Sequence, residues 1–272
     1  LPSGTGTLTA TNGVYYSGLF KNGKKDGYGV EIDDDGYSYI GDWADGHYSD
    51  QGKLTLSCGD VYEGSFTKSQ YNGKGKLIKT DGYSYNGDWV NGFCHGAGIE
   101  ENPTEKYTGH FCNNYRHGHG SSYSENGNVY IGQWRRGYRH GHGRETTLLS
   151  IYNGHWLRGK HYGHGTCISV ISGKYTGRWR DGKRHGQGVN VLDDVVYNGN
   201  WKNGMCHGEG TISYENGHYS GSWYENEYHG DGELCESGTI FIGRWEYGHR
   251  QGEFEEKTDG RIIKGTYKND MR

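Results

Sequence analysis

Aromatic and glycine residues alternate with polar residues along the chain, in short segments with a period of two. In the segment 130–134 (YIGQW), the tyrosine, the glycine and the tryptophan occupy every second position, which places them on one face of a β-strand. Gly141 and Gly143 share one face of the strand that follows, and Gly137 between the two segments marks a turn. The pattern therefore predicts a β-hairpin.

The same five-residue phrase recurs every 22 or 23 residues. It starts at Tyr16, Tyr39, Tyr62, Tyr85, Tyr107, Tyr130, Tyr152, Tyr175, Tyr197 and Tyr219, with degenerate copies at Phe241 and Ile263. A Gly-x-Gly pair follows each start before Ile263, except where Asp50 and Phe254 interrupt it. Because glycine inside a strand usually means that something approaches the backbone closely, we expect the aromatic rings of neighbouring hairpins to pack there.

These starts define one array over residues 1–272, cut within a repeat at both ends. We expect a partial repeat over 1–15 and a partial repeat over 263–272. Full repeats are expected to start near 16, 39, 62, 85, 107, 130, 152, 175, 197, 219 and 241. The absence of an initiator Met predicts a piece of a longer protein.

The composition bounds the fold and the compartment. Only 31% of the residues are hydrophobic while 51 are glycine, which argues against an ordinary globular core, and 14% aromatic content argues against disorder. The six scattered cysteines are expected to be reduced, which favours the cytoplasm. We find no apolar run of roughly 20 residues that would span a bilayer.

The repeated phrases resemble the MORN (membrane occupation and recognition nexus) repeat family, whose consensus is roughly Tyr-x-Gly-x-Trp-x-x-Gly-x-x-His-Gly-x-Gly. Segments 85–98 and 175–188 follow it closely. The resemblance implies an all-β fold, an elongated single-layer twisted antiparallel sheet of consecutive β-hairpins that forms a solenoid or gutter. It also implies a non-catalytic protein-interaction scaffold of a cytoskeletal, ciliary or membrane–cytoskeleton assembly.

Spacing and motif argue against a zinc site, a catalytic cysteine–histidine pair and a phosphate-binding loop. Equivalent histidines in adjacent hairpins would be roughly 9–10 Å apart, too far to share a zinc ion. The pairs Cys94–His95 and Cys206–His207 place thiol and imidazole on opposite strand faces. The glycine-rich segment 23–29 lacks the Gly-Lys-Ser/Thr ending of a phosphate loop. We expect no catalytic residue, no metal and no cofactor.

Charge distinguishes the repeats. Residues 130–188 hold eleven Lys/Arg against two acids, a formal charge of +9, whereas the rest of the chain carries −13. The basic residues fall mainly in one turn of consecutive hairpins: Arg135, Arg136, Arg139, Arg158, Lys160, Arg180, Lys183 and Arg184. A basic strip along one edge favours an anionic partner, such as a phosphoinositide headgroup, an acidic tail or a phosphorylated segment. A solvated edge with no partner is the alternative.

The leading hypothesis is a scaffold that holds a partner peptide or a second copy on its aromatic and glycine face. The candidate groove aromatics are Tyr85, Trp89, Tyr130, Trp134, Tyr152, Trp156, Tyr175, Trp179, Tyr197 and Trp201. The weaker last repeats suggest a self-association end, with Phe241, Trp245, Phe254, Ile263 and Tyr267, and hence a homodimer. The alternatives are an anionic phospholipid module that uses the basic edge, and the regulatory arm of a larger enzyme. No nucleic acid partner is expected, and we expect a cytoplasmic protein associated with the cytoskeleton or a membrane.

Overall fold

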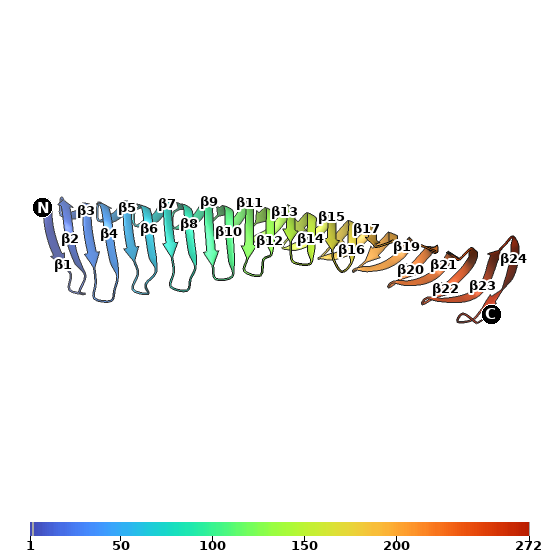
Figure 1. The fold of residues 1–272 in the computed structure, drawn as a ribbon. Coiled ribbons are helices and arrows are strands. Elements are labelled where there is room, and N and C mark those ends of the chain that lie inside the picture. The colour runs from blue at the N-terminus through green and yellow to red at the C-terminus, as the bar shows by residue number, and fades with distance from the viewer. Residues whose placement is uncertain (2, 272) are drawn as a thin grey trace. The chain divides into compact units, whose positions relative to one another are not determined.

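Every regular element in the part of the chain that the structure describes is a β-strand (Figure 1). The structure is a computed structural model, and it describes residues 1 and 3–271. The chain divides into two units, Leu1–Tyr138 and Arg139–Arg272, and each is considered by itself. The sequence-based prediction of an all-β fold of consecutive antiparallel hairpins is confirmed.

The first unit contains twelve complete strands. They are β1 (Gly4–Thr9), β2 (Tyr15–Lys21), β3 (Lys24–Ile32), β4 (Ser38–Ala44), β5 (His47–Thr55), β6 (Val61–Thr67), β7 (Gln70–Ile78), β8 (Ser84–Val90), β9 (Phe93–Asn102), β10 (Glu105–Cys112), β11 (Tyr115–Ser124) and β12 (Val129–Arg135).

The second unit begins within β13 (Tyr138–Thr146). It continues through β14 (Ser150–Leu157), β15 (Lys160–Ser169), β16 (Gly173–Arg180), β17 (Lys183–Leu192), β18 (Val195–Lys202), β19 (Met205–Tyr214), β20 (Gly217–Tyr224), β21 (Glu227–Glu236), β22 (Thr239–Glu246), β23 (His249–Thr258) and β24 (Arg261–Tyr267).

Glycine lies opposite glycine from strand to strand. Within the first unit, each strand pairs antiparallel with its neighbours in sequence, and a glycine row runs from Gly6 to Gly132. Within the second unit the row runs from Gly143 to Gly243, where Phe254 interrupts it. The period-two pattern of the phrase sets this register, because a slip by one residue would turn every ring to the other face.

Most glycines outside this row have a left-handed backbone, either in hairpin turns or at the first position of Gly-x-Gly. In the Asn91–Gly92 turn both residues have positive φ (49° and 81°), as the tight turns of β-hairpins require. Asp50 stands where the other repeats have the first glycine of Gly-x-Gly, and it adopts the same left-handed backbone, with φ of 48°. Aspartate tolerates this conformation better than most residues, so the second repeat keeps its shape.

The core lies on one face of the strands in each unit. The ten tyrosines that begin the complete phrases are at most 4% exposed. Nine of these rings lie over the backbone of two paired glycines of their own unit; a side chain at Gly98, for example, would place its Cβ 2.6 Å from the Tyr85 Cζ. Glycine is therefore required because the tyrosine occupies the space of its missing side chain.

Candidate binding surfaces

The tyrosine hydroxyl of each complete phrase donates to a backbone carbonyl oxygen, and six of the eight tryptophans do the same through Nε1. Trp43 Nε1 is buried without a hydrogen-bond partner among the described residues. The Tyr175 hydroxyl donates to the carbonyl oxygen of Arg178 at 2.8 Å, and Trp179 Nε1 donates to the carbonyl oxygen of Gly165 at 3.1 Å. The Tyr175 ring packs edge to face against Trp179 and Trp201, with centroids 5.1 and 5.4 Å apart. Burial raises the pKa of Tyr175 to about 12. The rings therefore form a dry core without a second sheet.

The ten candidate groove aromatics all belong to this core. Their exposed fractions are Tyr85 0%, Trp89 3%, Tyr130 0%, Trp134 6%, Tyr152 1%, Trp156 4%, Tyr175 0%, Trp179 8%, Tyr197 4% and Trp201 6%. They contact glycine backbone and one another, so most of their surface is already used within the sheet. These rings consequently expose little surface to which a peptide could bind.

A third row of side chains covers the core and was not singled out from the sequence. This covering column stands two residues before the first residue of each Gly-x-Gly motif. It consists of Lys25, Tyr48, Tyr71, Cys94, Arg116, Arg139, His161, Arg184, Cys206, Tyr228 and Arg250. Tyr48 stacks on Tyr39 at 3.8 Å between centroids, and Arg116 lies 4.7 Å from the Tyr107 ring. The signal in the sequence was one repeat position that holds only aromatic, sulfur or cationic residues.

Most cations of the covering column have a carboxylate partner. Lys25 pairs with Glu31 and Arg139 with Glu145. Arg250 pairs with Asp270 at 3.0 Å. These pairs neutralise charge that would otherwise lie half-buried against aromatic rings, where it is poorly hydrated.

Arg116 has the most complete environment of these cations. Its guanidinium contacts Glu100 and Glu105 at 2.6 Å each. Burial lowers the pKa of Arg116, but the two carboxylates outweigh burial and hold the pKa above its ordinary value. Arg116 is thus neutralised from two sides.

Arg184 differs from the other cations of the column. Its guanidinium donates to Ser172 Oγ at 3.0 Å and lies 5.0 Å from the rings of both Tyr175 and Trp201. Among residues 1 and 3–271, no carboxylate forms an ion pair with it. Burial lowers the pKa of Arg184, because the charged form loses hydration without gaining a counter-ion.

The predicted basic strip separates into exposed turn residues and core-covering residues. Arg158, Lys160, Arg180 and Lys183 are exposed, in two consecutive turns of the second unit. A hydrogen bond from the Gly182 amide to the His161 carbonyl, 3.0 Å long, joins these turns. The structure does not place Arg139 and Arg184 on the predicted basic edge, because both guanidinium groups lie over aromatic rings. Arg135 and Arg136 are exposed in the first unit.

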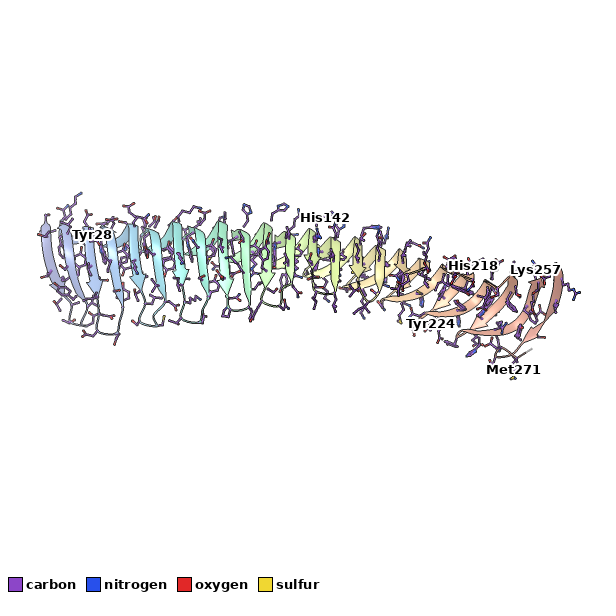
Figure 2. All side chains as sticks on the ribbon, viewed as in Figure 1. Tyr28, His142, His218, Tyr224, Lys257 and Met271 are labelled. Carbon is purple, nitrogen blue, oxygen red and sulfur yellow. The ribbon has the colours of Figure 1, made fainter. Side chains whose placement is uncertain are left out.

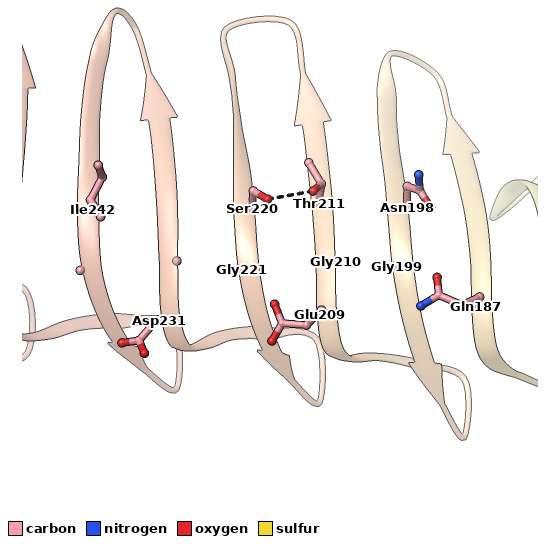
Figure 3. A pocket seen from close by; sticks show the side chains of 12 residues that line it. Gln187, Asn198, Gly199, Glu209, Gly210, Thr211, Ser220, Gly221, Asp231 and Ile242 are labelled. Atoms are coloured by element: carbon pink, nitrogen blue, oxygen red, sulfur yellow. Dashed lines mark hydrogen bonds between the residues drawn. The ribbon is translucent and has the colours of Figure 1, made fainter.

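The opposite face of the second unit carries a groove of about 730 Å³ (Figure 3). Successive residues of a strand point to opposite faces, so the residues that flank each glycine of the row point to this face and form the walls of the groove. The backbone of the glycines forms its floor. The walls consist of Gln187, Asn198, Glu209, Thr211, Ser220, Asp231 and Ile242. Thr211 and Ser220 share a hydrogen bond of 3.0 Å, and Ser222 donates to Glu209 at 2.6 Å. Six of the seven wall side chains are polar, and Glu209 and Asp231 make the groove acidic.

Three histidines, His142, His155 and His164, lie along the same face of β13 to β15, and Figure 2 labels the first of them. The ring centroids of His142 and His155 are 3.7 Å apart, and His155 Nδ1 lies 3.1 Å from the His164 carbonyl oxygen. Across the described residues, no group of three or more His, Cys, Asp or Glu side chains could hold a metal ion.

Burial raises the pKa of the Cys94 thiol to about 12, so this thiol is a poor nucleophile.

A family comparison matches the repeated phrase directly. The MORN repeat model matches residues 16–36, 62–82, 85–104, 107–129, 130–147, 152–173, 175–189, 197–218 and 219–240, well over half of the chain. The chain belongs to the MORN repeat family.

The residues that define a MORN repeat are those that build the core of this structure. The MORN tyrosine, glycine and tryptophan are buried or lie in the glycine row. The covering column, the groove walls and the turns vary between repeats. MORN repeats are protein- or lipid-interaction modules and are typically non-catalytic, and MORN proteins are often associated with membranes or the cytoskeleton. No helix among the described residues is long and apolar enough to cross a membrane.

Comparison with whole proteins adds little to the family assignment. No curated protein matches the chain. A mutant of the TCP10 domain of Danio rerio CPAP is 11% identical, with a TM-score of 0.25, and the match covers 88% of this chain and 99% of that one. A streptogramin B lyase structure is 10% identical, with a TM-score of 0.15, and the match covers 98% and 84%.

The last MORN repeats close their core differently. Phe254 replaces the second glycine, and its ring lies 4.2 Å from that of Tyr267 between centroids. Of the five residues predicted to form a self-association end, Trp245, Phe254 and Tyr267 are 2%, 8% and 8% exposed and Phe241 is half-buried. Ile263 is 39% exposed, on the terminal strand β24.

Proposed function

We propose that this MORN array is a binding scaffold that holds an extended basic segment of a partner protein in the glycine-floored groove of its second unit. The observation that carries the proposal is the groove itself, an open polar trough lined across several strands. A cytoskeletal, ciliary or membrane–cytoskeleton assembly is the setting we propose, since MORN proteins are often found in such places.

The groove suits an extended chain better than a compact ligand. Its floor is backbone, and its walls present amide, hydroxyl and carboxylate groups on successive strands. Such groups hydrogen-bond to an extended peptide, which has donors and acceptors at regular intervals. The ionisable residues lining the groove are Glu209 and Asp231, so a Lys or Arg in the partner gains a complementary charge.

A labelled peptide of alternating lysine and threonine tests the proposal by fluorescence anisotropy. Removing both groove charges, Glu209→Gln with Asp231→Asn, is expected to weaken binding about tenfold. The matched control, Glu225→Gln with Glu227→Gln, removes the same charge from an exposed turn of the same unit and should keep the affinity. Equal losses in the two double variants, or no loss in the first, would refute the groove as the binding site.

The exposed basic turns support a second candidate, binding to anionic membranes. Arg158, Lys160, Arg180 and Lys183 lie on consecutive turns, where Lys160 forms a loose ion pair with Asp181, 4.0 Å away with both side chains exposed. Vesicles containing phosphatidylserine should bind the protein in a salt-sensitive manner. Arg158→Glu with Arg180→Glu should abolish this binding, whereas Lys53→Glu with Lys76→Glu, on exposed strand residues of the first unit, should not. Binding that survives the first pair rules out the turns.

Self-association through β24 is a proposal of smaller reach. Ile262 and Ile263 are 59% and 39% exposed there, while Arg261 and Lys264 place charge along the same strand, which opposes edge-to-edge pairing. Light scattering after size exclusion would detect a dimer, and Ile263→Asp should convert it to a monomer. A dimer unaffected by this change uses another surface.

A further inference from the structure

Within the part of the chain that the structure describes, Arg184 is the one cation of the covering column without a carboxylate partner. Lys25, Arg116, Arg139 and Arg250 occupy the same repeat position, and each pairs with a carboxylate of this chain. Arg184 has Ser172 Oγ and two aromatic rings instead. The same repeat geometry therefore leaves one half-buried guanidinium without its negative partner.

The sequence shows which residue stands where the other repeats have the acidic partner. The acids that pair with Lys25 and Arg139 lie six residues further along, at Glu31 and Glu145. Six residues after Arg184 stands Asn190, an uncharged amide. Its Oδ1 is buried and has no hydrogen-bond partner among the described residues. This strand keeps the side-chain position but not the charge.

The strand before Arg184 does not replace that charge. Arg116 receives one of its carboxylates from Glu100, in the preceding repeat. The corresponding position before Arg184 is Cys167, whose thiol has a pKa raised by burial and is therefore neutral at ordinary pH. Neither neighbour supplies an anion.

We propose that Arg184 binds a carboxylate of an acidic side chain from a partner protein, on the aromatic face opposite the groove. A guanidinium offers five N–H donors in a planar fork that matches a carboxylate. The site is half-buried against rings, where such a pair is stronger than on an open surface. A carboxylate is the favoured anion because the chain itself uses carboxylates at the four equivalent cations.

An exposed aliphatic surface lies next to this position and narrows the partner further. Val170 and Ile171, which precede Ser172 in its turn, are 76% and 70% exposed. The adjacent turn contributes Leu148 and Leu149, 90% and 49% exposed, and the Val170 amide donates to the Leu149 carbonyl at 3.0 Å. Exposed aliphatic residues grouped in this way mark interaction surfaces. The partner segment accordingly carries an aliphatic residue beside its acid.

The test uses the whole chain and a labelled peptide of alternating leucine and glutamate, with a leucine–glutamine peptide for comparison. The acidic peptide should bind and the neutral one should not. Asn190→Glu supplies the counter-ion from within the chain and should weaken binding at least about tenfold, as Arg184→Gln should. Asn190→Gln is the matched control, of the same size but uncharged, and should retain binding.

The two Asn190 variants keep the proposal testable if Arg184→Gln fails to fold. Equal binding by Asn190→Glu and Asn190→Gln overturns it, as does equal binding of the two peptides. The Arg184 Nε–H resonance should shift when the acidic peptide is added to Asn190→Gln and stay still in Asn190→Glu. Stronger Arg184-dependent binding to phosphatidylserine vesicles than to the peptide would assign the site to lipid and also overturn the proposal. The groove is tested with a basic peptide, so the two proposals fail separately.

Discussion

Arg116 in the first unit and Arg184 in the second occupy the same position of their repeats and have opposite electrostatic environments. Both guanidinium groups lie about 5 Å from a tyrosine and a tryptophan ring. Arg116 contacts two carboxylates at 2.6 Å, whereas Arg184 contacts a serine hydroxyl at 3.0 Å. The repeat sets where the cation lies, and a few residues outside the repeat motif decide whether it is neutralised within the chain.

This difference separates two roles within one architecture. Tyrosine, glycine and tryptophan perform the same packing in both regions, so they carry no information about partners. The residues of the covering column, which vary between repeats, are in contact with this core and are held in place by it. A binding group on a rigid strand is better oriented than one on a loop, which is why the covering column is a suitable place for recognition.

The largest expected effect tests whether the cores of the two regions are built by the same glycine–tyrosine contact. A Cβ added at Gly120 would lie 2.5 Å from the Tyr107 Cζ, and one at Gly188 would lie 2.5 Å from the Tyr175 Cζ. Because neither buried ring can move aside, each glycine-to-alanine change should cost about 3 kcal/mol in the free energy of unfolding. Chemical denaturation measures this. Gly127→Ala, in open space with φ of 81°, should cost about 1 kcal/mol from backbone strain alone; a similar loss at all three sites would contradict the packing argument.

The second prediction separates the two arginines. Arg116→Met leaves Glu100 and Glu105 partly buried without a cation, and we expect a loss of about 2 kcal/mol, below the value for a fully buried pair because these side chains keep some exposure. Arg184→Met removes no ion pair and should change stability by about 1 kcal/mol or less. Thermal unfolding of the two variants gives the comparison. Equal losses would mean that Arg116 and Arg184 have equivalent environments.

The third prediction concerns acid stability. Burial raises the pKa of Glu145, but His161 and Arg139 outweigh burial and hold it below its ordinary value of 4.5. A carboxyl whose pKa is lowered by folding stabilises the fold fully above its unfolded pKa, and this contribution is lost as the pH falls through the folded pKa. Stability measured from pH 6 downward should therefore decline less steeply in Glu145→Gln. A steeper decline in that variant would reverse the assigned sign.

The smallest effect is expected at the exposed turn beside Arg180. Lys160 and Asp181 are 4.0 Å apart with side chains 62% and 73% exposed. Such pairs contribute little, and asparagine suits the left-handed turn position that Asp181 occupies at φ of 52°. Asp181→Asn should shift the free energy of unfolding by less than about 0.5 kcal/mol. A loss above 1 kcal/mol would show that this pair matters to the fold.

The hairpins were predictable because their signals are local. Alternation with a period of two, glycine at the turns and a repeat every 22 or 23 residues need no knowledge of distant contacts. The interruption at Asp50 was also visible, but its harmlessness was not, since only the backbone shows that Asp50 takes the glycine conformation. The groove on the opposite face was not predicted, because its walls combine residues from several strands.

The sequence by itself determined the repeat, the all-β class and the residues that pack, because a strict period leaves one register in which all the rings share a face. Only the tertiary structure decided what those residues do. The aromatic rings predicted to line a groove are buried in the core, and Arg139 and Arg184 lie over that core and not on the basic edge. The tertiary structure also revealed that, among residues 1 and 3–271, Arg184 has no carboxylate partner, unlike its counterparts. The physical reason is that burial and counter-ions depend on neighbouring strands, and the charge of one residue does not contain that information.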